Sequence, residues 1–256
     1  IPAGALWYNT FRQALGLPDF AYSQFQDFLA TPAPDGSINP VAFSITQGEL
    51  LLAAARDLEV PVNPGFDQGL VQLAKTPRPQ QVDGVNLWVL GPRPQNLEKL
   101  KKDWLKWYEQ RKKKPSFGSG AQRSANAIDR AVANRSSIIL LAESGGRRIL
   151  LTGDAHGDDI LFALKQAGLT DANGRLHLDV FKVQHHGSLR NASPEFFQKI
   201  TADTYVISAN KHVNDGNPDL DTLNWILDAP RPNGRIRLVA TNLTLTLKTI
   251  RSRIKK

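Results

Sequence analysis

The chain lacks cysteine and methionine altogether, and its 256 residues include five histidines, the first of them His156. Without cysteine there is no disulfide, thiolate zinc site or cysteine nucleophile, so His, Asp or Glu must hold any metal ion. No stretch approaches the roughly 18 consecutive apolar residues that span a bilayer, and the amino terminus has no signal-peptide pattern. We therefore expect a soluble, cytoplasmic protein.

Methionine is missing even from position 1, where the chain opens on Ile1. This start predicts an incomplete sequence. The chain is then a fragment or a processed product, or residues have dropped out of it and shortened some motif spacings.

Positive charge exceeds negative charge, with 32 Lys and Arg against 24 Asp and Glu and a net charge of +8 at pH 7. The excess is concentrated in residues 99–114 and 251–256. Such clusters attract polyanions, so nucleic acid or another phosphodiester is the expected partner. A solvated helix face is the alternative for the lysines, and a protein partner also remains open. The charge is supporting evidence only.

Few regular elements are predicted before residue 136. Leucines at helical spacing predict a helix over residues 47–58, an apolar run predicts a strand over 85–90, and an amphipathic stripe predicts a helix over 95–111. The following residues have little periodicity and collect Gly, Ser, Arg, Lys and Asn, which predicts a mobile basic loop. We expect one domain with three parts: residues 1–111, the loop over 112–135, and residues 136–256.

The pattern sharpens after residue 136 into alternating strands and helices, which is typical of an α/β fold. Ser193 and Pro194 are expected to cap and open one of the helices. The strands are predicted at residues 137–142, 148–151, 178–183 and 204–208, with a helix over 156–167 and a closing hairpin of strands over 235–240 and 243–250.

Two tracts carry the candidate chemistry: LLTGD at residues 150–154 and VFKVQHHGS at residues 180–188. Each begins as an apolar run of strand length and ends in residues that bind cations, which places the ligands at the carboxyl ends of adjacent buried strands. Ligands of α/β proteins bind at such ends. Asp154 is a candidate metal ligand and catalytic residue, although it is also placed to cap the following helix.

Adjacent histidines at a strand end are hard to explain as packing, because neighbouring side chains of an extended chain point to opposite sides. We predict that His186 is a metal ligand and that His185 supports it or contacts the substrate, and the reverse assignment stays open. His156 either lines the same site or lies on the surface. His177 is expected on the surface, and a site role is not favoured for His212. Three further substrate contacts are predicted around the pair: Lys182, Ser188 and Arg190.

Five tracts together resemble the metallo-β-lactamase superfamily, in particular its branch with the hydrolase domain of DNA-uptake competence proteins. They are NRSS (134–137), GGRR (145–148), LTGDA (151–155), KVQHHGS (182–188) and VISA (206–209). The resemblance implies a four-layer αββα sandwich with one or two zinc ions at the sheet edges. It also implies that Asp154 matches the aspartate that bridges the two metals and that His186 matches the last histidine ligand.

One departure from the family is serious. Members carry an earlier His-x-His-x-Asp-His motif, and this chain has no histidine before His156. We expect that motif, together with the amino-terminal strands, to lie upstream of Ile1; the alternative is a degenerate relative. Catalytic zinc needs about three protein ligands, which Asp154 and one histidine do not supply.

The sequence thus predicts a metal-dependent hydrolase, a phosphodiesterase or nuclease, that uses water activated by Zn²⁺ or Mn²⁺. The first alternative is a non-catalytic module of the same fold that binds nucleic acid or a protein. The second is a hydrolase of a lactam, lactone or thioester.

Overall fold

The computed structural model describes residues 4–16, 40–66, 69–113, 130–208 and 216–254. The chain divides into two compact units. The first consists of Ile1–Val71 and Pro94–Ala133, and the second of Gln72–Arg93 and Asn134–Lys256. In the described part of the chain, no helix combines the length and the apolar character that a membrane crossing requires.

The first unit is helical, with α1 (Phe11–Leu15), α3 (Pro40–Asp57) and α4 (Pro94–Lys113). Thr10 caps α1 because its hydroxyl accepts a hydrogen bond from the Gln13 amide at 3.0 Å. The helix α4 is amphipathic: Leu97 and Leu100 are buried, whereas its lysines at positions 99, 102 and 106 are exposed.

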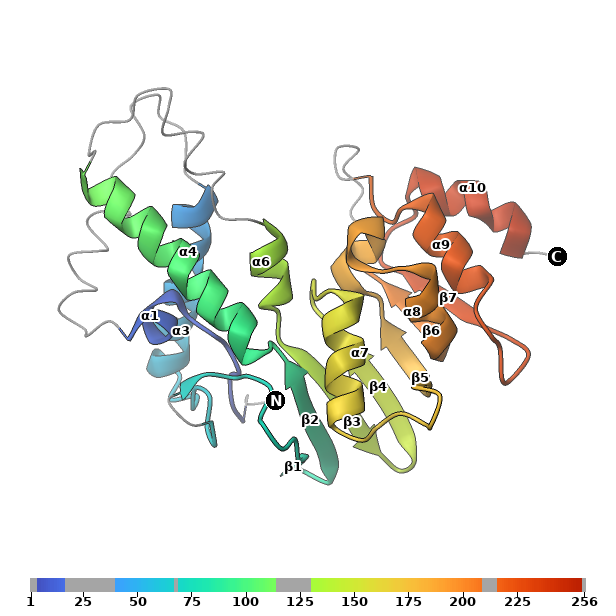
Figure 1. Ribbon diagram of the computed structural model, residues 1–256, viewed down its shortest axis with the longest axis horizontal. Coiled ribbons are helices and arrows are strands. Elements are labelled where there is room, and N and C mark those ends of the chain that lie inside the picture. Colours follow the sequence, from blue (N-terminus) through green and yellow to red (C-terminus); the bar gives the residue numbers. More distant parts are fainter. Residues whose placement is uncertain (1–3, 17–39, 67–68, 114–129, 209–215, 255–256) are drawn as a thin grey trace. The chain divides into compact units, whose positions relative to one another are not determined.

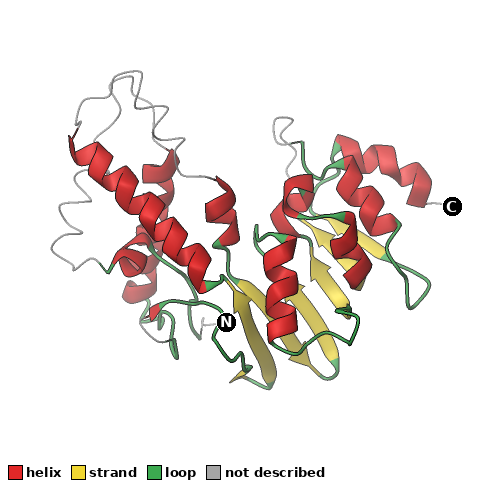
Figure 2. Ribbon diagram, viewed as in Figure 1, coloured by secondary structure: helices red, strands yellow, loops and turns green. Residues whose placement is uncertain are grey.

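The second unit is built on one seven-stranded sheet whose strands follow chain order (Figures 1 and 2). Neighbouring strands are antiparallel from β1 to β4 and parallel from β4 to β7. The strands are β1 (Gln80–Val82), β2 (Val85–Gly91), β3 (Ile139–Ser144), β4 (Arg147–Leu151), β5 (Leu176–Lys182), β6 (Ile200–Ile207) and β7 (Arg237–Ala240).

The helices between the parallel strands lie on one face of the sheet (Figure 1). Right-handed crossovers that add strands in one direction place every connecting helix on the same side. The other elements of this part are α7 (Gly157–Gln166), the 3₁₀ turns η2 (Gln184–Gly187) and η3 (Leu189–Asn191), α8 (Pro194–Lys199), α9 (Leu220–Leu227) and α10 (Leu245–Ile254). The helix α6 (Arg130–Arg135) begins in the first unit and ends in the second.

The core lies between this helical layer and the sheet. It contains four fully buried aromatic side chains, Phe181, Phe196, Phe197 and Tyr205, with ring centroids of neighbours 5.2 to 6.4 Å apart. Such tilted aromatic contacts stabilise a core beyond the area that they bury.

The opposite face of the sheet leaves apolar side chains in solvent. Leu140, Leu151 and Lys182 lie side by side across three strands, and Ala142, Ile149 and Val180 form the next row. The exposed fractions of Ile149 and Leu151 are 38% and 44%. This face is therefore apolar and only partly covered.

Two predicted elements are wrong. A strand was expected over residues 243–250, but residues 245–250 belong to the helix α10. In addition, β7 pairs with β6 in parallel and not in a hairpin. The Leu-Thr-Leu-Thr-Leu alternation imitates a strand, but Leu247 and Ile250 are the buried residues and they lie three apart, at helical spacing.

The loop predicted over residues 112–135 also contains helical structure, because Lys113 ends α4 and Arg130–Arg135 forms α6. Residues 114–129 lie outside the described part. The α/β class is confirmed, and the described residues form a single mixed sheet.

Candidate functional site

The two candidate tracts meet at the carboxyl ends of β4 and β5. These strands are parallel neighbours with Leu151 beside Lys182, so the residues after them emerge at one edge of the sheet. The amide of His185 donates to the carbonyl oxygen of Gly153 at 3.0 Å, which joins the two loops directly. The prediction that both tracts end at one sheet edge is therefore confirmed.

The backbone of the histidine pair is in the left-handed region. The φ angles are +44° at His185, +56° at His186 and +83° at Gly187. A left-handed non-glycine residue costs on the order of 1–3 kcal/mol and occurs preferentially at functional sites. At Gly187 a side chain is also excluded by space, because a Cβ atom would lie 2.7 Å from the Cβ of Pro218.

This turn corrects the expectation that the pair is extended. The strand ends at Lys182, and a tight left-handed turn follows it. The rings of His185 and His186 nevertheless point in different directions, with centroids 6.0 Å apart and ring planes at 69°.

The His186 ring is held by the end of the next strand. Its Nδ1 lies 2.6 Å from the carbonyl oxygen of Ser208, which only accepts hydrogen bonds. Nδ1 therefore carries the proton, and the lone pair of Nε2 is available to a ligand. Metal-binding histidines usually have this arrangement.

The His185 ring has two carboxamide neighbours. Its Nδ1 lies 2.7 Å from Oδ1 of Asn191 and 3.2 Å from Nδ2 of Asn134. The Asn191 amide nitrogen in turn donates to the carbonyl oxygen of Asp154 at 2.8 Å. The carboxyl ends of both strands are thus connected through one buried side chain.

Asp154 presents its carboxylate at this edge. Its backbone amide donates to the hydroxyl of Ser137 at 3.2 Å. The carboxylate has no hydrogen bond or ion pair within the described ranges of the chain. Burial lowers the pKa of Lys182, and the negative charge of Asp154 opposes this decrease. Lys182 is therefore a half-buried cation in the electrostatic range of Asp154.

His156 belongs to the same neighbourhood. It is the N-cap residue of α7, so the alternative role of Asp154 as the cap of this helix is wrong. Burial is the main cause that lowers the pKa of His156. The positive charge of Arg135 and, more weakly, His185 lower it further, whereas Asp158 and Asp159 raise it.

The remaining predicted residues have different surroundings. Ser188 is buried, and its hydroxyl accepts a hydrogen bond from the Arg190 amide at 3.4 Å as the cap of η3. Arg190 itself is exposed. His177 lies in the first part of β5 and contacts Thr201 at 2.9 Å, and His212 falls in residues 209–215, outside the described ranges.

The donors at this edge do not complete a metal site by themselves. Among the described residues, no three His, Asp or Glu side chains come together as a metal-binding group. Catalytic zinc needs about three protein ligands. Asp154 and the histidine pair therefore supply part of the donor set that such a site would need.

Comparison with known proteins finds one partial similarity. Over 89 residues, which are 35% of this chain and 11% of the relative, the chain is 35% identical to ComE operon protein 3 of Bacillus subtilis (strain 168). The match thus spans about a tenth of the relative's length. No family model and no solved structure matches the chain.

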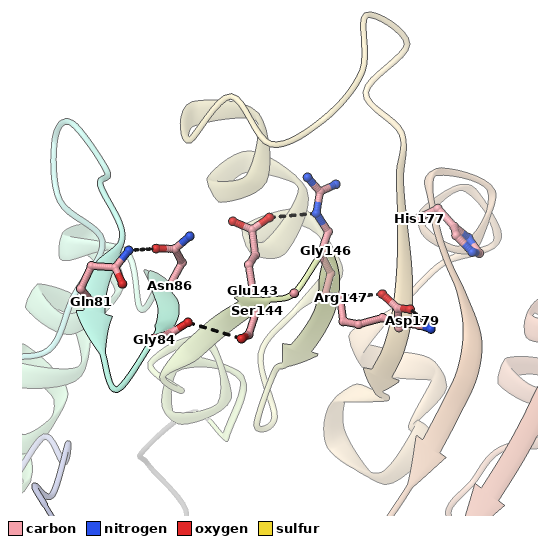
Figure 3. Close-up of a pocket in the computed structure, with 11 residues that line it drawn as sticks. Gln81, Gly84, Asn86, Glu143, Ser144, Gly146, Arg147, His177 and Asp179 are labelled. Atoms are coloured by element: carbon pink, nitrogen blue, oxygen red, sulfur yellow. Dashed lines mark hydrogen bonds and ion pairs between the residues drawn. The ribbon is translucent and has the colours of Figure 1, made fainter.

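A cavity of about 520 Å³ lies away from these residues, at the β3–β4 turn (Figure 3). Its charged groups are paired: Arg147 contacts Asp179 at 2.5 Å and Arg148 contacts Glu143 at 2.8 Å. None of the predicted site residues lines it. Its lining consists of Gln81, Gly84, Asn86, Glu143, Ser144, Gly145, Gly146, Arg147, Arg148, His177 and Asp179.

Sequence reasoning missed Asn134 and Asn191, the two carboxamides at the His185 ring. Asn134 opens the tract NRSS (134–137), but nothing in the tract indicated a contact to a histidine. Asn191 follows Arg190 in a polar stretch, and nothing in the sequence indicated that its side chain is buried, with 2% exposure.

Proposed function

We propose that the carboxyl ends of β4 and β5 form part of the active site of a metal-dependent hydrolase of phosphodiesters, with DNA as the substrate. The observation that carries this proposal is the meeting of Asp154, Lys182 and the histidine pair at one sheet edge, where the His185 amide bonds to Gly153. A carboxylate and imidazoles with fixed rings are groups that acid–base and metal-ion catalysis use, and a half-buried cation suits a phosphate.

DNA as substrate rests on charge and on similarity. The net charge of +8 favours a polyanion. The identity with ComE operon protein 3 supports the resemblance to DNA-uptake competence proteins. Lys182 is the residue we propose for contact with a phosphate, because burial has already removed part of the water around its ammonium group.

Zinc is the metal we propose, in one or two ions, with manganese as the substitute. Asp154 and Nε2 of His186 would hold it, and a ligand outside the described residues would complete the site. When bound, such a metal lowers the pKa of its water towards about 7 and polarises the scissile phosphate. His185 would orient the substrate, with His156 beside it.

The finer fold we propose is the four-layer sandwich of the metallo-β-lactamase type. Its support is the partly covered apolar face of the sheet, on which Ile149 and Leu151 are exposed. A second sheet is the layer that packs on such a face in a β-sandwich.

A non-catalytic module that binds nucleic acid is the second candidate. The observation in its favour is the missing third metal donor among the described residues. In this case Lys182 and the basic segments would bind the phosphate backbone without cleavage.

Metal content and DNA cleavage, measured together, distinguish the two functions. Inductively coupled plasma mass spectrometry is applied to the wild-type chain and to the double variant Asp154→Ala/His186→Ala, with labelled single-stranded and duplex DNA as substrates. The matched control is His177→Ala/Asp203→Ala, which removes a His–Asp pair 3.1 Å apart elsewhere on the same sheet.

We expect near-stoichiometric zinc or manganese and cleavage in the wild type and the control, and the loss of both in the site variant. A wild-type chain that binds DNA but contains no metal and does not cleave DNA would contradict the hydrolase and support the binding module. Equal metal content in both double variants would show that Asp154 and His186 do not bind the metal.

A further inference from the structure

We propose that Asn191 is a positioning residue, which fixes the tautomer and the ring orientation of His185. The relevance of this role to catalysis rests on the proposed function, whereas the role itself does not. Asn191 is 2% exposed and lies at the end of η3.

The orientation of the Asn191 side chain is decided by Asp154. A carbonyl oxygen accepts hydrogen bonds and does not donate them, so the group 2.8 Å from the Asp154 carbonyl must be the amide nitrogen of Asn191. The carboxamide oxygen then faces the other way, towards His185.

This oxygen decides the position of the imidazole proton. Oδ1 of Asn191 lies 2.7 Å from Nδ1 of His185, a distance at which an unprotonated nitrogen would meet the oxygen lone pair to lone pair. Nδ1 therefore carries the proton, and Nε2 keeps its lone pair towards the site. The Asn134 nitrogen, at the longer distance of 3.2 Å, does not donate to a protonated Nδ1.

The two histidines consequently have separate supports. His185 is fixed through Asn191 by the loop after β4, and His186 is fixed by the carbonyl oxygen of Ser208 at the end of β6. A change at Asn191 should alter His185 and leave His186 as it is.

A purely structural role of Asn191 makes a different prediction. Its backbone bonds, from its amide to Ser188 and from Gln184 to its carbonyl, do not need its side chain. If Asn191 only stabilised the loop, its replacement would lower the stability and leave the proton of His185 in place.

The test is the ¹⁵N NMR spectrum of the histidine rings in the full chain, without metal, at about pH 9, where histidine side chains are ordinarily neutral. Wild type should show His185 protonated at Nδ1. In Asn191→Leu, which has nearly the same volume and no acceptor, His185 should change to the Nε2-protonated form, while Asn191→Asp, which keeps the acceptor, should retain Nδ1–H.

Asn134→Leu is the matched control, because it removes the other carboxamide at the same nitrogen and should leave the tautomer unchanged. His186 serves as the internal reference in every spectrum. Wild type with the proton on Nε2 of His185 would overturn the proposal even if Asn191→Leu failed to fold, and so would an unchanged tautomer in a folded Asn191→Leu.

Activity separates this proposal from the proposed function. If both hold, Asn191→Leu should lose about 10- to 100-fold in DNA cleavage and keep its metal content, because Asp154 and His186 are the proposed metal ligands. A tautomer change in Asn191→Leu, together with a wild-type chain that never cleaves DNA, would support the role of Asn191 and contradict the hydrolase.

Discussion

Arg135 donates to the buried carboxylate of Asp159 at 2.6 Å, and this ion pair connects the end of α6 to the first turn of α7. The same nitrogen also contacts Asp158 at 2.8 Å, and Arg93 approaches Asp159 from the end of β2 at 3.2 Å. Two carboxylates thus share one arginine, but the Asp159 side chain is 2% exposed and the Asp158 side chain is 64% exposed.

This difference in burial predicts different costs of removal. Asp159→Ala leaves the arginines without their buried partner and should lower the free energy of unfolding by about 3 kcal/mol. Asp158→Ala removes a solvent-exposed pair and should change it by less than about 1 kcal/mol. Urea unfolding of both variants measures the two values, and similar losses would show that burial does not determine the strength of these pairs.

Alkaline pH should destabilise the fold through Tyr205. Burial raises the pKa of this tyrosine to about 12, above the ordinary value of about 10, because the phenolate is poorly solvated in the core. The folded state therefore keeps the proton to higher pH than the unfolded state, so stability is full below about pH 10 and falls as the pH rises towards about 12.

In Tyr205→Phe, the free energy of unfolding should fall less steeply between about pH 10 and 12. Near pH 7 this variant should be less stable by about 1 kcal/mol, because it loses the hydrogen bond from the Ala202 amide. Thermal unfolding across this alkaline range, with wild type in parallel, measures the effect. An equally steep decrease in both proteins would assign it to other groups.

The helix α10 makes a prediction that a strand would not. Leu247→Ala or Ile250→Ala should each cost about 2–4 kcal/mol, because both side chains lie in the core of the second unit. Leu245→Ala is the control, since Leu245 is 80% exposed. In a strand, Leu245 and Leu247 would share one face and respond alike, so the stabilities of the two alanine variants distinguish a helix from a strand.

The exposed face of α4 should contribute to binding of a polyanion. Its lysines follow helical spacing and are exposed, whereas Leu97 and Leu100 on the apolar side are buried. Each lysine that contacts a phosphate adds about 0.7–0.9 to the steepness of the plot of log affinity against log salt concentration. Replacing three of them by Gln should lower this slope by about 2–3 units; the residues are Lys99, Lys102 and Lys106.

Fluorescence anisotropy with labelled DNA over a series of salt concentrations measures the slope. The matched control replaces three exposed lysines of the second unit, Lys165, Lys199 and Lys248. Equal changes in both triple variants would mean that only the net charge matters and that α4 is not a specific surface.

The elements with strong local signals could be predicted from the sequence. The hairpin of β3 and β4 follows from two apolar runs around Gly145 and Gly146, whose positive φ angles suit a tight turn. Ser193 caps α8 as predicted, because its hydroxyl accepts a hydrogen bond from the Phe196 backbone amide. Over residues 243–250 the local signals were ambiguous. The helix forms there because it packs Leu247 and Ile250 against the core.

The sequence alone determined which residue types end each strand, and so it placed Asp154, His185 and His186 at one sheet edge. This follows because apolar runs and the polar residues after them are local properties of the chain. The tertiary structure alone decided that Asn191 reaches both Asp154 and His185, and that Ser208 holds His186. Such contacts join residues from separate loops, and their directions depend on the left-handed turn after β5, which the alternation of apolar and polar residues does not predict.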